Sequence, residues 1–315
     1  MSNAKSVAAP APPSPSPAEA APAPARRRAD GRRRRERFIG LLFVSPFCLV
    51  VVAFLLLPLA YALRMSLYTS TLAAGTHFSG LANYRKAFTD PEFLHGVERV
   101  IVFAVVQTPV MLALALVSAL ILDAVTGKLA KFFRLAMFMP YAVPAVIGAL
   151  MWGFLYSPTF GPLHSVFHGS LLSGNLILTS LGNVATWQWA GYNMIILYAA
   201  LQGMPREVYE AALVDGAGPV RTALRIKVPM ISSALILCVV FSMIGALQFF
   251  TEPRVLRPLA PTISPSYTPN LYSFSLAFQY SQFNYSAAIS FALGAVVFVG
   301  SYLFLFLTRK RSGLS

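Results

Sequence analysis

Five long stretches of the sequence contain no Asp, Glu, Lys or Arg, and they restrict the chain to a membrane fold. They are residues 38–63, 100–122, 135–205, 228–251 and 258–308. A helix needs about 20 apolar residues to cross the hydrocarbon core of a bilayer, and each stretch is long enough. Only 11% of the 315 residues are charged, whereas soluble domains carry about a quarter. The sequence therefore predicts an all-α integral membrane protein and argues strongly against a soluble enzyme.

Helix-breaking residues divide these stretches into separate predicted spans. Prolines and glycines in the segment 157–175 interrupt the longest stretch, so we expect two helices there rather than one. Five further prolines predict that residues 251–286 form a long loop before the last span. The six predicted transmembrane helices cover approximately residues 38–62, 98–122, 135–156, 184–204, 229–250 and 287–307.

The distribution of basic residues predicts the orientation of the chain. Nine of the 25 lysines and arginines precede residue 38, and most of the others fall on the same side of the predicted spans. By the positive-inside rule both termini are expected in the cytoplasm. Residues 1–36 are rich first in Ala and Pro and then in Arg, which predicts a disordered cytoplasmic tail that attracts anionic membrane lipid. Residues 37–315 form the predicted transmembrane domain.

The chain lacks the sequence patterns of several other function classes. The net charge is +14, but the basic residues flank apolar runs instead of a soluble domain, so no nucleic acid is expected as a partner. Cys48 and Cys238 lie inside apolar stretches, and the four histidines lie in predicted outer loops without metal-ligand spacing. No disulfide framework, metal site or catalytic residue is therefore predicted.

An energy source is also absent from the sequence. The phosphate-binding pattern GxxxxGK[ST] requires Ser or Thr after Gly-Lys, and the only Gly-Lys, at residues 127–128, is followed by Leu129. No predicted span carries an ionisable residue near its middle, which is where ion-coupled carriers place one. We expect no cofactor in this chain, and ATP-driven work would require ATP and Mg²⁺ on a partner chain.

The segment Met204–Ile231, MPREVYEAALVDGAGPVRTALRIKVPMI, joins the fourth and fifth predicted spans. Pro205 lies where a helix can begin, because its missing N–H is not needed in the first turn. Helix-forming residues continue to Val214, and Gly216 allows a sharp stop. Pro219 can then open a second short helix. The pattern predicts two short cytoplasmic helices joined at glycine.

This segment carries a motif with exact spacing. Glu210-Ala211-Ala212 is followed after three residues by Gly216, and nine residues later by Ile226-Lys227-Val228-Pro229. It resembles the signature of permease subunits of bacterial ATP-binding-cassette importers, Glu-Ala-Ala, three residues, Gly, nine residues, Ile-x-Leu-Pro. Val228 in place of leucine is the one departure. In that family the loop, here residues 205–230, docks on the ATPase. The resemblance implies an ATPase-coupling role for Glu210, Ala211, Ala212, Asp215, Gly216, Ile226 and Pro229.

The resemblance extends from Phe38 onward. Ser45-Pro46, Gly80–Tyr84, Met139-Pro140 and Asp215–Ala217 are similar to the carbohydrate-type branch of the family. The resemblance implies the type I ABC importer permease fold in the inner membrane of a bacterium. In that fold two different permeases pair with two ATPase subunits and an external substrate-binding lipoprotein. Transport would proceed by alternating access, with this chain contributing one half of the cavity and one coupling loop.

Amide and aromatic residues in the fourth and fifth predicted spans are candidates for substrate contact, because sugars are held by hydrogen bonds and by aromatic faces. The candidates are Asn193, Gln248, Gln188, Tyr192 and Trp189. Trp187 and Trp189 fit an interfacial aromatic belt equally well, and Gln107, Asn193 and Gln248 fit interhelical hydrogen bonding.

Three functions remain open at this point. The first is a permease subunit of an ATP-driven importer of a sugar or oligosaccharide. The second is the same machinery importing glycerol 3-phosphate or a glycerophosphodiester, for which a cavity-facing arginine or helix N-terminus would be expected. The third is an ion-coupled carrier or channel that acts without an ATPase.

Overall fold

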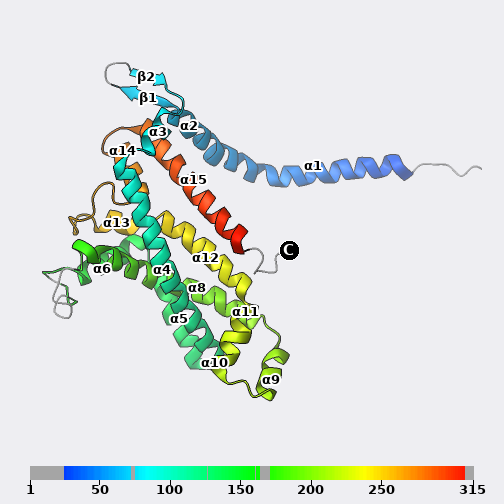
Figure 1. Cartoon of the computed structure of the whole chain (residues 1–315). Coiled ribbons are helices and arrows are strands. Elements are labelled where there is room, and N and C mark those ends of the chain that lie inside the picture. The colour runs from blue at the N-terminus through cyan, green and yellow to red at the C-terminus, as the bar shows by residue number, and fades with distance from the viewer. Residues whose placement is uncertain (1–24, 72–74, 126, 160, 164–170, 309–315) are drawn as a thin grey trace, which may run out of the picture. The chain divides into compact units, whose positions relative to one another are not determined.

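The computed structural model describes residues 25–71, 75–125, 127–159, 161–163 and 171–308 (Figure 1). The chain divides between Leu59 and Ala60 into two compact units, and each is described by itself. The first contains helix α1, Ala25–Val51, a π-helical turn at Val52–Leu56 and the start of helix α2, Leu57–Ser66.

Helix α1 begins earlier than the sequence analysis predicted. The expected disordered tail extended to residue 36, but the helix starts at Ala25 and includes the arginine-rich segment. The segment 25–36 contains Ala, Arg and Glu, which favour helix, and no proline. The remainder of the predicted tail, residues 1–24, lies outside the described residues.

The second unit begins with the rest of α2 and continues with a small β-hairpin that the all-α prediction did not include. Strand β1, Tyr68–Thr71, pairs antiparallel with β2, Gly75–Phe78, and Tyr68 lies opposite Phe78. Their rings meet edge to face at 5.5 Å, a favourable cross-strand pair. The following helix α3, Ala82–Ala87, contributes Asn83, whose amide donates to the carbonyls of Ser66 and Tyr68 at 2.9 and 2.8 Å.

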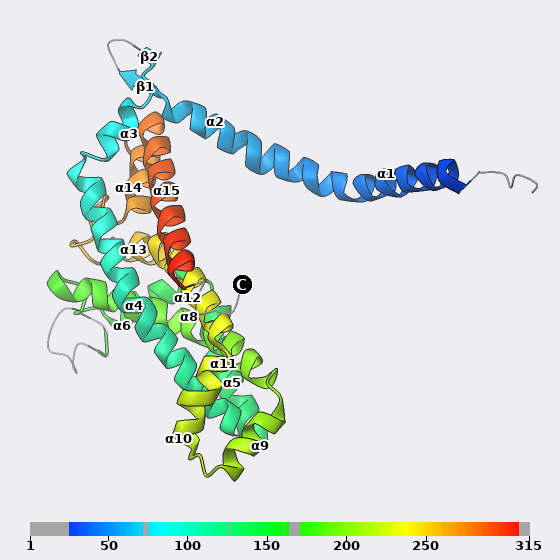
Figure 2. The ribbon, with the colours of Figure 1, turned by 45° about the vertical axis from the view of Figure 1, so that its right-hand side comes forward.

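The core of the second unit is a helix bundle centred on α4, Pro91–Ala124, and α8, Ile177–Gln202. Helix α4 starts at a proline, and the preceding Asp90 side chain accepts from the Glu92 amide at 3.0 Å, which is a standard N-cap. Helices α12, Ser232–Leu247, and α5, Lys128–Ala142, pack beside this pair, while α15, Phe283–Thr308, packs against α12 and α14, Pro269–Phe278 (Figures 1 and 2).

The predicted third span, residues 135–156, is not one straight helix. Helix α5 ends at Ala142, α6 covers Ala145–Leu155, and their axes differ by 97°. Pro144 is the cause, because the residue before a proline is driven out of the α region, and Val143 is extended at φ −74°, ψ 128°. The Gln188 amide on α8 donates to the Val143 carbonyl at 3.0 Å, which satisfies one group at the break.

The predicted loop 251–286 is also partly helical. It contains α13, Thr251–Leu256, and α14. Pro269 occupies the first turn of α14, and the Thr268 hydroxyl caps that helix by accepting from the Leu271 amide at 3.2 Å. This proline starts a helix because its missing N–H would have no partner in the first turn.

Among the described residues, four helices are long and apolar enough to cross a membrane, or five if the bent α5–α6 pair forms one span. The four are Phe38–Ser66, Pro91–Ala124, Ser232–Leu256 and Phe283–Leu307. Helix α8, which contains the predicted span 184–204, is about 39 Å long at 1.5 Å per residue. It is not among them because its polar residues lower its hydropathy, and it lies within the bundle, against α4, α5 and α12.

Candidate functional site

The motif loop folds as two short helical segments joined at glycine, as predicted. Helix α9, Arg206–Val214, is followed by α10, Pro219–Thr222, a π-helical turn at Ala223–Lys227 and α11, Val228–Met230. Gly216 has φ +71°, and the Ala217 amide donates to the Ala212 carbonyl at 2.9 Å. This is the Schellman pattern, in which a left-handed residue ends the helix. The motif glycine therefore sets the angle of the loop.

The residues of the predicted coupling set are differently accessible. Glu210, Ala211, Asp215, Gly216 and Pro229 are exposed, and Ile226 is half-buried. Ala212 is 5% exposed and faces the chain's own interior. A direct contact between Ala212 and another subunit is therefore not available on this surface, and its small side chain instead lets α9 pack closely.

A buried ion pair ties this loop to the helix bundle. Lys227, in the π-helical turn, pairs with Asp123 at the end of α4, with 2.5 Å between Nζ and Oδ2. The other Asp123 oxygen accepts from the Gln202 amide at 2.7 Å. The Lys227 ammonium also lies 4.6 Å from the centre of the Tyr209 ring on α9. Burial, and secondarily the Asp123 charge, raise the pKa of Tyr209, so this phenol stays neutral.

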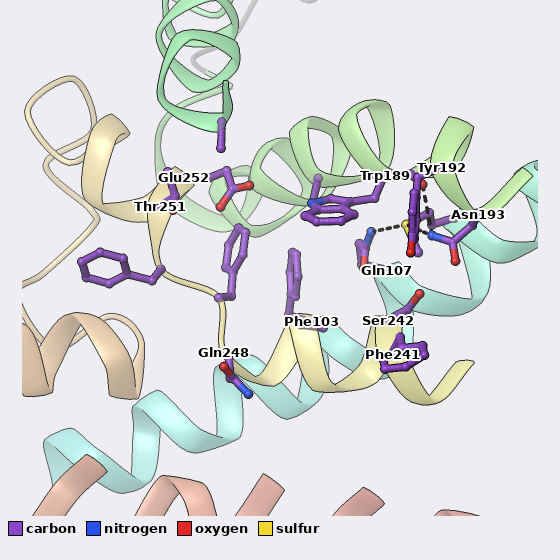
Figure 3. Close-up of a pocket in the computed structure, with 17 residues that line it drawn as sticks. Phe103, Gln107, Trp189, Tyr192, Asn193, Phe241, Ser242, Gln248, Thr251 and Glu252 are labelled. Atoms are coloured by element: carbon purple, nitrogen blue, oxygen red, sulfur yellow. Dashed lines mark hydrogen bonds between the residues drawn. The ribbon is translucent and has the colours of Figure 1, made fainter. Parts of the chain in front are cut away.

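A second site, which we term the central cavity, lies between α4, α8, α12 and α13 (Figure 3). Its volume is about 260 Å³. Apolar side chains and a few polar groups line it, a composition typical of small-molecule sites. The polar residues in its wall are Gln107, Asn193, Ser242, Gln248, Thr251 and Glu252. The aromatic residues are Phe103, Trp189, Tyr192, Phe241, Phe249 and Phe250.

Aromatic rings form one side of the central cavity. Tyr192 stacks on Tyr141 with ring centres 4.8 Å apart, and Trp189 meets both rings edge to face at 6.1 and 5.4 Å. Tyr141 comes from α5 and packs against the Trp189 and Tyr192 rings of α8. On the other side, Phe103 and Phe249 stack at 4.4 Å. The cavity therefore presents flat apolar faces of the kind that pack against sugar rings.

The structure brings together four of the five predicted substrate-pathway residues. Asn193, Gln248, Trp189 and Tyr192 line the central cavity. The Asn193 amide nitrogen donates to the Trp189 carbonyl at 3.0 Å. Gln188 does not line the cavity, because it is buried and its amide bonds the Val143 carbonyl.

The two tryptophans of the predicted aromatic belt separate into different roles. Trp189 lines the cavity. Trp187 packs against α6, with its ring centre 5.9 Å from that of Trp152. A Cβ added to Gly148 would lie 3.2 Å from the Trp187 ring, so the two are in close contact.

Sequence reasoning did not include Glu252 among the substrate-pathway residues. The chain turns at residues 248–250, and α13 carries Glu252 to the wall of the cavity. Phe103 and Ser242 were also missed, and Gln107 was assigned only to helix contacts. Its amide nitrogen lies 3.3 Å from the Thr186 hydroxyl oxygen, so that assignment also holds. The sequence signal that could have identified Glu252 is its position as the first charged residue after the apolar run 228–251.

No group of three or more His, Cys, Asp or Glu side chains in the described part of the chain could hold a metal ion. His164 and His168 lie outside that part.

Comparison with known proteins places these features in a family. Residues 111–311 match the family described as binding-protein-dependent transport system inner membrane component. The chain is 30% identical to the lactose transport system permease protein LacF of Rhizobium radiobacter, over 86% of this chain and 94% of that protein. It is also 30% identical to the diacetylchitobiose uptake system permease protein NgcF of Streptomyces coelicolor, over 90% and 86%.

Two further comparisons extend this likeness. The sn-glycerol-3-phosphate transport system permease protein UgpA of Agrobacterium fabrum is 30% identical over 62% of this chain and 69% of that protein. A chain in the crystal structure of a bacterial alginate ABC transporter, in complex with alginate pentasaccharide-bound periplasmic protein, superposes with a TM-score of 0.77 at 18% identity. The superposition covers 90% of this chain and 98% of that one, and it shows a shared fold.

The apolar helices, the central cavity and the motif loop define a multi-pass membrane transport protein. The chain belongs to the binding-protein-dependent transport system inner membrane component family, the permease subunits of ATP-binding-cassette importers.

Proposed function

We propose that this chain is one of two permease subunits of an ATP-driven importer that moves a sugar or oligosaccharide across the bacterial cytoplasmic membrane. The observation that carries the proposal is the central cavity, in which aromatic faces and amide groups converge between α4, α8 and α12. Relatives named for lactose and diacetylchitobiose uptake support a carbohydrate cargo. Alternating access would open this cavity first to one side of the membrane and then to the other.

The proposed topology has six transmembrane helices and both termini in the cytoplasm. The bent pair α5–α6 supplies the third crossing and helix α8 the fourth, beside the four apolar helices. The basic residues of the motif loop and of the N-terminal segment then share one side, as the positive-inside rule requires. In this topology loop 205–230 faces the cytoplasm.

The proposed assembly contains a second, homologous permease, two ATPase subunits and an external substrate-binding lipoprotein. ATP and Mg²⁺ would be held by the ATPases. The structural relative in complex with a periplasmic protein supports the external partner. The second permease would complete the cavity, which this chain lines from one side.

The surface of the motif loop supports docking of an ATPase. Val214 is 88% exposed at the end of α9, and Val220 is 70% exposed on α10. Exposed apolar side chains beside the acidic Glu210 and Asp215 form a mixed surface of the kind that binds a partner. We infer that Glu210 and Val214 contact the ATPase directly, and that Gly216 acts by shaping the loop.

Import of glycerol 3-phosphate by the same machinery is the second candidate, supported by the relative UgpA. A phosphate would require a cationic or N–H-rich wall. Neither Lys nor Arg lines the central cavity within the described residues, which favours the sugar.

Replacing Glu210 by arginine should abolish ATP-driven uptake while the chain remains inserted in the membrane. Glu210 is exposed, so the change reverses a surface charge without burying one, and repulsion at the ATPase surface should prevent docking. Uptake by membrane vesicles and co-purification of the ATPase measure the effect, and we expect at least a tenfold loss of both.

The matched control is Glu98→Arg, the same charge reversal on an exposed side chain of α4. It should leave uptake and ATPase retention unchanged. Normal uptake by the Glu210→Arg protein would remove the coupling role of the loop.

A further inference from the structure

We propose that Glu252 makes the central cavity electronegative, so that the permease admits neutral, hydroxyl-rich solutes and rejects anionic ones. This inference rests on the proposed transport function and names the residue that sets charge selectivity. It would separate sugars from phosphate esters and acidic saccharides at a step after delivery by a binding protein.

The position of Glu252 is the first observation. Residues 248–250 interrupt the helical path between α12 and α13, and α13 then starts with Thr251 and Glu252 in the cavity wall. Figure 3 shows the Glu252 carboxylate and the Trp189 indole directed toward the same space. Glu252 is 5% exposed and lines this cavity.

The absence of a compensating charge is the second observation. Within the described residues, the salt bridges join His95 to Glu98 and Lys227 to Asp123, and neither involves Glu252. Arg254, two residues along α13, stacks over the Phe274 ring at 5.1 Å and does not line the cavity. In the part of the chain that the structure describes, no Asp, Lys or Arg accompanies Glu252 in the wall of the cavity.

A carboxylate that has no cationic partner in the described residues and lines a cavity has defined consequences for solutes. It accepts hydrogen bonds from hydroxyl groups, which neutral sugars supply in abundance. It repels phosphates and uronates, because like charges at close range interact strongly where the surrounding dielectric is lower than that of water. The aromatic faces of Trp189 and Tyr192 add apolar contact without favouring an anion.

The test measures the cavity's charge directly, with thiol reagents as model solutes. Thr251→Cys places a thiol in the cavity wall, in full-length chain from which Cys48 and Cys238 have been removed as Cys48→Ser and Cys238→Ala. Permeabilised membranes are treated with cationic, anionic and neutral methanethiosulfonates of similar size. The rates at which the Thr251→Cys thiol reacts with the cationic and the anionic reagent give a ratio. This ratio is compared between the protein that keeps Glu252 and the same protein with Glu252→Gln.

We expect the cationic-to-anionic ratio to fall by about tenfold or more in Glu252→Gln, since one charge near the thiol changes both rates in opposite directions. Glu252→Asp keeps the charge and should keep the ratio, and the neutral reagent should react equally in all variants. Glu98→Gln, which removes an exposed carboxylate on α4, should have no effect.

An unchanged ratio in Glu252→Gln would overturn the proposal, as would an equal fall in Glu98→Gln. Gel filtration and neutral-reagent labelling show whether each variant is folded. These rates do not depend on transport, so a failure here is distinct from a failure of the importer proposal, which uptake assays report.

Discussion

Gly191→Ala on α8 is expected to lower the stability of the folded chain much more than Gly182→Ala on the same helix. A Cβ at this position would lie 1.8 Å from the Met137 carbonyl oxygen and 2.6 Å from its carbonyl carbon. Both are backbone atoms of α5, so no side chain can turn aside and the two helices must separate. Overpacking of this kind costs about 3 kcal/mol. We expect the thermal midpoint of the detergent-solubilised protein to fall by about 10 °C.

The same substitution should also damage the central cavity, because the α5–α8 contact holds Tyr141 against Tyr192. Gly182→Ala on the same helix is the control. There the nearest atoms are side-chain carbons of Gln107 and Phe103 at 3.7 Å, an ordinary contact distance, so the midpoint should change by no more than about 2 °C. Equal losses at the two glycines would contradict the close α5–α8 packing.

Asp123→Asn is expected to disconnect the motif loop from the helix bundle. The Asp123 and Lys227 side chains are 7% and 17% exposed, and removing one partner of such a buried pair costs about 3 kcal/mol. The Lys227 ammonium would retain the Tyr209 ring and a neutral amide oxygen, but no negative charge to compensate its own. In proteoliposomes that contain the assembled importer, we expect ATP hydrolysis to continue while uptake per ATP falls at least fivefold.

The charge-reversed double variant Asp123→Lys with Lys227→Asp separates coupling from simple loss of structure. The reversed pair can reform the attraction, and the Gln202 amide oxygen can accept from the new lysine. Uptake per ATP should recover to at least half of its original value, with each single reversal remaining defective. Normal uptake per ATP in Asp123→Asn would show that this ion pair does not carry motion from the loop.

Local patterns predicted the parts of this molecule that depend on neighbouring residues. The spacing of Pro205, Gly216 and Pro219 predicted the two short helical segments of the motif loop, because capping and left-handed glycine act within one turn. Charge-free runs located the apolar helices near Phe38, Val100 and Ala287. The ends differ by several residues, since periodicity does not locate the exact cap.

Features that depend on distant contacts could not be predicted. Asp123 and Lys227 are far apart in sequence and meet only because α4 and α12 pack together. Gln188 and Asn193 are similar residues on one helix, and only the position of the α5–α6 break places the first on a carbonyl and leaves the second in the cavity. Proline was misleading as well, because Pro269 begins a helix where a loop was expected.

We expect this chain to transport its cargo only when an ATPase is docked on the motif loop. The most direct test is purification of the tagged full-length chain in mild detergent, followed by mass spectrometry of co-purifying proteins and reconstitution into liposomes. We expect recovery of an ATPase, a second permease and a binding lipoprotein, with sugar uptake that requires ATP. Recovery of the chain alone, folded and active in liposomes without ATP, would contradict it.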